Sequence, residues 1–237
     1  MKIIDNSAAV ATPLNSELAT SCLFRRLRPE QASALRRDMW FHTYAHAEPV
    51  FEAGDAGDRL QIIRTGRVKV SRPLADGTPY LLAVLGPGDL LGVLPGLDTG
   101  PREETAIAVT HVTTGSLPYS VLRKWCIVVP TVGLELARER QDRLRELEQR
   151  RIDQVRLDAP GRLAKLLLGW ADRFGTADGD TITVDHRLTQ RELGELIGTS
   201  RETVCLAMRQ FVTRGWIRNT DRGVRVLHRA ELARRAR

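Results

Sequence analysis

Two short helices joined by a glycine turn are encoded near the carboxyl end of the chain, and they constrain its fold more than any other feature. Thr189 and Glu192 have the spacing of a capping box, which begins a helix. Gly198 ends that helix, and Thr199 or Ser200 caps a second one. The inward positions of the two helices are Leu193, Leu196, Ile197, Val204, Ala207, Met208 and Phe211. This pattern predicts a helix-turn-helix, and residues 215–217 and 224–226 around a turn at 221–223 predict a two-stranded wing behind it.

The first turn of the second helix carries polar side chains suited to reading DNA. Arg201 can grip O6 and N7 of guanine with two donors, and Glu202 can accept a hydrogen bond from N4 of cytosine. An alternative interpretation is that Glu202 only closes a capping box with Thr199 and that Arg201 is a solvated charge. The preceding helix, the turn and the local excess of arginine favour DNA reading. The candidate DNA-binding residues are Thr189, Gln190, Ser200, Arg201, Glu202, Thr203, Leu206 and Arg209.

The excess positive charge is confined to the same end of the chain. The net charge is +7, from 36 Lys and Arg against 29 Asp and Glu. Residues 187–237 hold 12 arginines and 5 acids, so they account for all of it and the first 186 residues are neutral. A neutral body joined to a basic terminal segment is typical of a protein with a nucleic-acid-binding terminal domain.

The pattern of residues in the chain before this basic segment changes at Pro130. Between about residues 41 and 117, short apolar runs alternate with glycine-containing turns, which predicts a β sandwich or barrel. The predicted strands are 49–51, 60–63, 68–70, 80–84 and 106–109, and residues 33–37 predict a short helix.

A long helix is predicted from Glu135 to Asp158, where the chain is free of glycine and rich in Arg, Glu and Leu. Its irregular apolar stripe favours a dimer seam over simple docking on the sandwich. Pro160 and Gly161 are predicted to break it. A second helix follows with an apolar face at Leu163, Leu166, Leu167, Trp170 and Phe174.

Several classes of protein are disfavoured by what the sequence lacks. Three widely spaced cysteines contain no CxxC pair, which argues against a zinc ribbon and suits a reducing cytoplasm. No signal peptide is recognisable at the start, and the apolar stretch 80–97 is interrupted by Asp89, glycines and prolines, so we expect no membrane span. We find no catalytic Ser/His/Asp group, HExxH motif, phosphate loop or metal cluster, and therefore expect neither an enzyme nor a cofactor.

The Ser-Arg-Glu-Thr-Val run at 200–204 resembles the recognition helix of the cyclic AMP receptor protein (Crp/Fnr) family of bacterial transcription regulators, in particular its actinobacterial members. The resemblance covers residue 20 to the end and includes the glycine-punctuated sandwich and the run Pro160-Gly161-Arg162. It implies an α+β chain with a cyclic-nucleotide-binding-like β jelly roll, a long dimerisation helix and a winged helix-turn-helix. The expected divisions are a loose arm at 1–20, a sensor domain at 21–130, the dimerisation helix at 131–158 and the DNA-binding domain at 159–237.

The resemblance also implies partners. A homodimer would place its two recognition helices in successive major grooves, about 34 Å apart, on a pseudo-palindromic double-stranded operator. RNA polymerase is a further implied partner, and the implied location is the cytoplasm.

The expected effector pocket departs from the family pattern. Members that bind cyclic AMP carry Phe-Gly-Glu-Leu, whose glutamate accepts from the ribose, and Pro-Arg-Ser/Thr, whose arginine and hydroxyl bind the phosphate. Here the first motif contains Gly92, Val93 and Leu94, and the second keeps Arg102 but has Glu103 in place of the hydroxyl. Leu147 stands where a threonine usually meets adenine.

These changes predict that cyclic AMP is not the main switch. An unpaired buried hydroxyl costs about 1–3 kcal/mol. A carboxylate about 4 Å from the phosphate would add about 4 kcal/mol of repulsion at an effective dielectric near 20. One arrangement consistent with this is that Arg102 pairs with Glu103 or Glu104 and closes the cavity electrostatically.

In the recognition helix, Leu206 stands where the family often has Arg or Lys. Leucine can touch a thymine methyl but cannot donate to a base, so we expect an altered base preference opposite this position.

The sequence favours a DNA-binding regulator that is not switched by cyclic AMP, and it leaves two alternatives open. One is a regulator of the same fold that senses haem, a gas, another nucleotide or another ligand, for which His42 and His46 would share one face of a strand. The other is a signalling module that acts through protein contacts. The effector, the target genes and the sign of regulation are not specified by the sequence.

Overall fold

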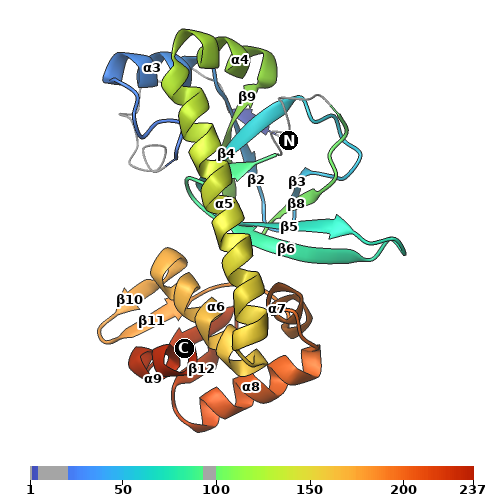
Figure 1. Ribbon diagram of the computed structural model, residues 1–237, viewed down its shortest axis with the longest axis vertical. Coiled ribbons are helices and arrows are strands. Elements are labelled where there is room, and N and C mark those ends of the chain that lie inside the picture. The colour runs from blue at the N-terminus through green and yellow to red at the C-terminus, as the bar shows by residue number, and fades with distance from the viewer. Residues whose placement is uncertain (1, 5–20, 93–99) are drawn as a thin grey trace. The chain divides into compact units, whose positions relative to one another are not determined.

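The computed structural model describes residues 2–4, 21–92 and 100–237, and for residues 2–4 only the backbone (Figure 1). Its contacts divide the chain into two compact units, residues 1–144 and 145–237. The helix α5 (Pro130–Arg156) contributes to both. The α+β class predicted from the sequence is confirmed.

The first unit contains two antiparallel sheets. One has five strands in the order β1-β2-β9-β4-β7, with bounds Lys2–Ile4, Trp40–Tyr44, Val112–Pro118, Arg59–Thr65 and Leu90–Leu91. The other has four in the order β3-β8-β5-β6, with bounds Pro49–Phe51, Thr105–Ala108, Val68–Pro73 and Pro79–Leu85. The five predicted strands are therefore confirmed, and β1, β2, β7 and β9 are additions to them. Residues 2–4, which were expected to lie in a loose arm, form β1 and pair antiparallel with β2.

The two faces of the five-stranded sheet bury separate apolar clusters because successive side chains in a strand point to opposite sides. One cluster lies between the sheets and joins Tyr44, Ile63 and Val112 to residues of the four-stranded sheet, among them Phe51 and Val70. The other covers the opposite face and contains Phe41, Leu60, Ile62 and Leu117 together with helical side chains.

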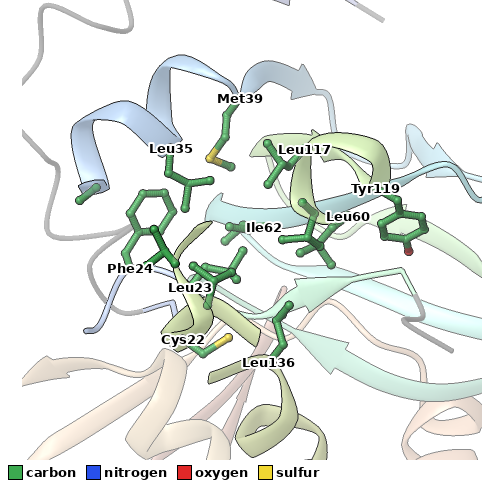
Figure 2. Close-up of a cluster of buried hydrophobic side chains, with 14 of the residues drawn as sticks. Cys22, Leu23, Phe24, Leu35, Met39, Leu60, Ile62, Leu117, Tyr119 and Leu136 are labelled. Atoms are coloured by element: carbon green, nitrogen blue, oxygen red, sulfur yellow. The ribbon is translucent and has the colours of Figure 1, made fainter. Parts of the chain in front are cut away.

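Three helices supply those side chains: α3 (Pro29–Arg37), α4 (Tyr119–Val128) and the beginning of α5. Figure 2 shows Leu35 and Leu136 of these helices, together with Leu23 of the turn before α3, gathered against Leu60 and Ile62 of the sheet. The predicted helix at 33–37 is thus the second half of α3. The long predicted helix begins five residues earlier than expected, because Pro130 is accommodated at its first position, where no backbone N–H is needed.

The second unit begins with the end of α5 and continues into α6 (Ala159–Phe174). Asp158 is the N-cap of α6, and its carboxylate accepts a hydrogen bond from the Gly161 amide at 3.0 Å. Pro160 and Gly161 therefore lie in the first turn of α6, whereas they were expected to separate the two helices. The predicted apolar face is confirmed for Leu163, Leu167 and Trp170, all of which are buried.

The remaining elements are a four-stranded sheet and three helices. The strands follow the order β10-β11-β13-β12, with bounds Thr176–Asp178, Thr181–Val184, Gly223–Val226 and Ile217–Thr220. The helices are α7 (Gln190–Ile197), α8 (Arg201–Thr213) and α9 (Arg229–Arg235). The predicted two-stranded wing, β12 and β13, is extended by β10 and β11, because Ile182 pairs with Val226 across the sheet. Within the described residues, no helix is long and apolar enough to cross a membrane.

Candidate nucleic-acid interface and effector pocket

The helix-turn-helix is built by local hydrogen bonds that the sequence predicts. The Glu192 amide donates to the Thr189 hydroxyl at 3.2 Å, and the Thr189 amide donates to the Glu192 carboxylate at 2.8 Å, which closes the capping box. Gly198 ends α7 in the left-handed conformation, with φ of +66°. Ser200 caps α8 by accepting from the Thr203 amide at 3.2 Å, so the cap is Ser200 rather than Thr199.

Burial on one side of α8 fixes which side is presented to solvent. Val204, Ala207, Met208 and Phe211 are buried, and the Phe211 ring stacks on Trp216 at 5.6 Å between centroids. The opposite face exposes Arg201, Glu202, Leu206 and Arg209. Leu206 is 59% exposed, an apolar side chain held in water on an otherwise polar face. The structure thus brings four predicted DNA-binding residues onto one accessible face.

The other predicted residues surround the beginnings of the two helices. Thr189 is exposed at its N-cap, and Gln190 is half-buried in the first turn of α7. The pKa of the Glu202 carboxyl is lowered by hydrogen bonds from the backbone amide of Glu202 itself and from the Ser200 hydroxyl. Glu202 is therefore held as an ionised acceptor at the start of α8.

The arginines of this unit fall into two sets. One set is paired with carboxylates, as in the pairs Arg191–Glu195, Arg225–Asp178 and Arg229–Asp172. The other set makes no ion pair within the described chain and includes Arg201 and Arg209 on α8 and Arg218 and Arg222 on the β12–β13 hairpin. Unpaired guanidinium groups on one helix face and one hairpin are the chemistry required for phosphate and base contacts.

In the first unit, Gly92 and Arg102 lie together. A Cβ at Gly92 would be 2.2 Å from Nη1 of Arg102, and Gly92 has φ of +93°, so only glycine fits there. Arg102 is buried, donates to the Arg59 carbonyl at 2.6 Å and lies 4.4 Å from the Phe51 ring centroid. Its Nε is buried without a partner.

The expected pairing of Arg102 with Glu103 or Glu104 is wrong. Both carboxylates bind Arg72 of β5, at 3.2 Å and 3.1 Å, and the Glu103 side chain is 72% exposed. Glu103 is therefore directed outward to a neighbouring strand rather than toward the arginine, and the strong repulsion expected from it does not follow from this geometry. Val93 and Leu94 lie outside the described residues. Leu147 lies on α5 and is half-exposed.

His42 and His46 do not share a strand face. The strand β2 ends at Tyr44, so His46 is exposed in the following turn, whereas His42 is buried and its Nε2 lies 3.3 Å from the Ser116 hydroxyl. Burial is the first cause that lowers the His42 pKa, and the charge of Arg59 adds to it. Over residues 2–4, 21–92 and 100–237, no group of three or more His, Cys, Asp or Glu side chains could hold a metal ion.

Comparisons with known proteins agree with this division of the chain. Residues 161–235 match the family described as the Crp-like helix-turn-helix domain, and residues 41–127 match the cyclic nucleotide-binding domain. A protein of Mycobacterium tuberculosis described as a CRP-like cAMP-activated global transcriptional regulator is 40% identical over 220 residues, covering 93% of this chain and 98% of its own. This chain belongs to the Crp/Fnr family.

Solved Crp/Fnr structures show the same architecture. The catabolite activator protein of Thermus thermophilus is 30% identical, with a TM-score of 0.51 over 91% of this chain and 98% of its own. FixK2 of Bradyrhizobium japonicum is 23% identical and shares the fold, with a TM-score of 0.70 over 83% of this chain and 96% of its own. The match to the Crp-like helix-turn-helix domain and the 40% identical relative show that this chain is a transcription regulator with a helix-turn-helix DNA-binding domain, and not an enzyme.

Sequence reasoning missed three features of this Crp/Fnr chain that bear on the site. The first is the pair of ion pairs from Arg72 to Glu103 and Glu104, which join segments about thirty residues apart and so leave no local sequence pattern. The second is the β10–β11 hairpin, whose strands are too short and too polar to give a strand pattern. The third is α9, whose Arg235 forms an ion pair with Asp158 at the start of α6.

Proposed function

We propose that this Crp/Fnr protein is a cytoplasmic regulator that binds a pseudo-palindromic operator as a homodimer and reads bases with the exposed face of α8. The observation that carries the proposal is the set Arg201, Glu202, Leu206 and Arg209, exposed on one face of a helix whose other face is buried. The N-terminal turn of such a helix presents side chains to base edges and amides to phosphates. RNA polymerase is the further partner that membership in the family suggests.

The proposed dimer is supported by the apolar side chains that α5 leaves in water. Leu144 is 60% exposed, Leu147 49% and Val155 85%, and three helical turns separate the first from the last. An apolar stripe along a 27-residue helix that is otherwise highly charged favours pairing with a second helix of the same kind. A dimer also matches the two-fold symmetry of a palindromic operator.

We further propose that cyclic AMP is not the main switch. Position 93 is valine and position 103 is glutamate, so neither the carboxylate acceptor for a ribose nor the hydroxyl donor for a phosphate is present. The support is the lost hydrogen bonds rather than repulsion by Glu103. Arg102 is also engaged by the protein itself, through the Arg59 carbonyl and the Phe51 ring.

A second candidate is a regulator of the same fold that answers to a different anion. The buried, partnerless Nε of Arg102 favours it, because a charged donor without an acceptor inside a protein is unfavourable until an anion or water binds it. Titration calorimetry with cyclic AMP tests whether cyclic AMP is the main switch. We expect no low-micromolar affinity for cyclic AMP, and such an affinity would contradict the proposal that cyclic AMP is not the main switch.

Selection from randomised duplex DNA tests the DNA-reading proposal. Wild-type protein should return a palindrome with two half-sites about one helical turn apart. Arg201→Ala should relax the preference at one position of each half-site, worth about 1–3 kcal/mol. Arg237→Ala removes the same charge from the exposed C-terminus and should leave the selected sequence unchanged. Recovery of unrelated sequences by the wild type would refute the proposal.

A further inference from the structure

One side chain, Arg162 of α6, binds backbone carbonyls from the ends of two other helices. Its Nη1 donates to the Leu157 carbonyl at 2.7 Å, just beyond the end of α5. Its Nε donates to the Ile197 carbonyl at 2.7 Å, and its Nη2 lies 3.3 Å from the Gly198 carbonyl. Ile197 ends α7 and Gly198 forms the turn, so the guanidinium joins α5 directly to the helix-turn-helix.

The chemistry of helix ends explains why an arginine suits this place. The last carbonyls of a helix have no partner within it and carry the negative end of the helix dipole. A guanidinium offers five N–H donors in a rigid plane, so it can serve several carbonyls at once. A lysine ammonium in the same place would keep the charge but would not reproduce the planar fork.

Neighbouring contacts attach the same end of α5 to the same body. Asp153 of α5 forms an ion pair with Lys165 of α6 at 2.7 Å. A Cβ at Gly198 would lie 3.0 Å from Nε2 of Gln154, so the turn packs closely against the last turn of α5. Residues 145–156 accordingly belong to the second compact unit with the DNA-binding elements.

We propose that Arg162 is the positioning residue that transmits the position of the α5 end to the beginning of α8. Gly198 is two residues before Ser200, the N-cap of α8, so a carbonyl held at Gly198 fixes where the first turn of α8 begins. Arg162 itself need not touch DNA. The inference rests on the proposal that α8 reads bases, since its effect is on the placement of that helix.

The test compares Arg162→Lys and Arg162→Ala with the wild type and with Arg156→Ala, an exposed arginine at the end of α5 that serves as control. For each protein, fluorescence anisotropy gives the affinity for the selected palindrome and for a scrambled duplex. Hydrogen exchange gives the protection of the Thr199 amide, which donates to the Gly194 carbonyl at 2.9 Å.

We expect both Arg162 variants to lose about tenfold or more of the ratio between specific and scrambled affinity, equivalent to about 1.4 kcal/mol, while scrambled-duplex binding stays near that of the wild type. The Thr199 amide should exchange faster in both variants, and Arg156→Ala should match the wild type in every measurement. A folded Arg162→Lys protein with wild-type discrimination and wild-type exchange would overturn the inference, even if Arg162→Ala fails to fold. If wild type and Arg201→Ala both fail to discriminate, the DNA-reading proposal fails, while the exchange data still decide whether Arg162 holds the turn.

Discussion

The guanidinium of Arg102 donates a hydrogen bond to the main-chain carbonyl of Arg59, with 2.6 Å between Nη2 and the oxygen. Arg102 is therefore held in the interior of the first unit by groups of the protein itself, the Arg59 carbonyl and the Phe51 ring. We predict that Arg102→Ala lowers the free energy of unfolding by about 1–3 kcal/mol in nucleotide-free buffer, because the partly buried Arg59 carbonyl loses a charged donor. Chemical denaturation measures the effect.

The control is Arg72→Ala, which removes an arginine that is 48% exposed and bound to Glu103 and Glu104. Exposed ion pairs contribute about 0–1 kcal/mol, so this variant should be close to the wild type. Equal stability of Arg102→Ala and wild type would show that Arg102 has no structural role.

The Asp158–Arg235 ion pair predicts a pH dependence of stability. The hydrogen bond from Arg235 is the first cause that lowers the pKa of Asp158 below its usual 3.8. A lowered pKa in the folded state stabilises the protein above the unfolded value, and the contribution is lost as the pH falls through the folded value. Asp158→Asn retains a side-chain oxygen for the N-cap but removes the charge.

Thermal unfolding at several pH values checks this. The wild type should be more stable than Asp158→Asn at pH 7 by less than about 1 kcal/mol, since the Asp158 side chain is 59% exposed. The difference should vanish at pH values well below 3.8. A difference that is constant with pH would mean that the charge of Asp158 is not involved.

Much of the DNA-binding half could be predicted because its signals are local. The Thr189–Glu192 capping box and the glycine after Ile197 define α7 within a dozen residues, and both are found in the structure. Strand β9 was missed because its segment, Val112–Pro118, contains no run of apolar residues. In the fold its interior glycine, Gly115, packs closely against its neighbours, since a Cβ there would lie 2.6 Å from the terminal methyl of Met39 and 3.1 Å from the Phe41 ring.

The effector pocket could be predicted only as a set of residues. Gly92 and Arg102 do lie together, but the direction of Glu103 depends on Arg72, a partner on another strand. The same limit applies to Arg162, whose role depends on carbonyls of Leu157 and Ile197 that come together only in the folded unit.

Leu206 should determine part of the operator sequence. We predict that Leu206→Arg creates a preference for guanine opposite this residue, worth about 1–3 kcal/mol, because arginine supplies the two donors that leucine lacks. Selection from randomised DNA and competition binding measure it. Leu206→Ala, which removes the apolar contact without adding donors, is the matched comparison. If all three proteins select one half-site, residue 206 does not face a base.

The proposed dimer seam is tested on α5. Leu147→Glu should weaken self-association at least tenfold, because burial of a leucine contributes about 1.5–3 kcal/mol and the change occurs twice in a dimer. Sedimentation velocity over a concentration series gives the dissociation constant. Leu74→Glu alters an exposed leucine after β5 and should not affect association. A monomeric wild-type protein at all concentrations would exclude the seam.

The most direct test of the account is a titration that pairs one side chain with one base atom. Wild type and Arg201→Ala are each titrated with the selected palindrome containing either guanine or 7-deazaguanine, which lacks the N7 acceptor, at each guanine in turn. At one guanine per half-site, 7-deazaguanine should weaken wild-type binding at least about fivefold and leave Arg201→Ala unaffected. Equal losses for both proteins at every guanine, or no loss for either, would contradict the claim that α8 reads bases.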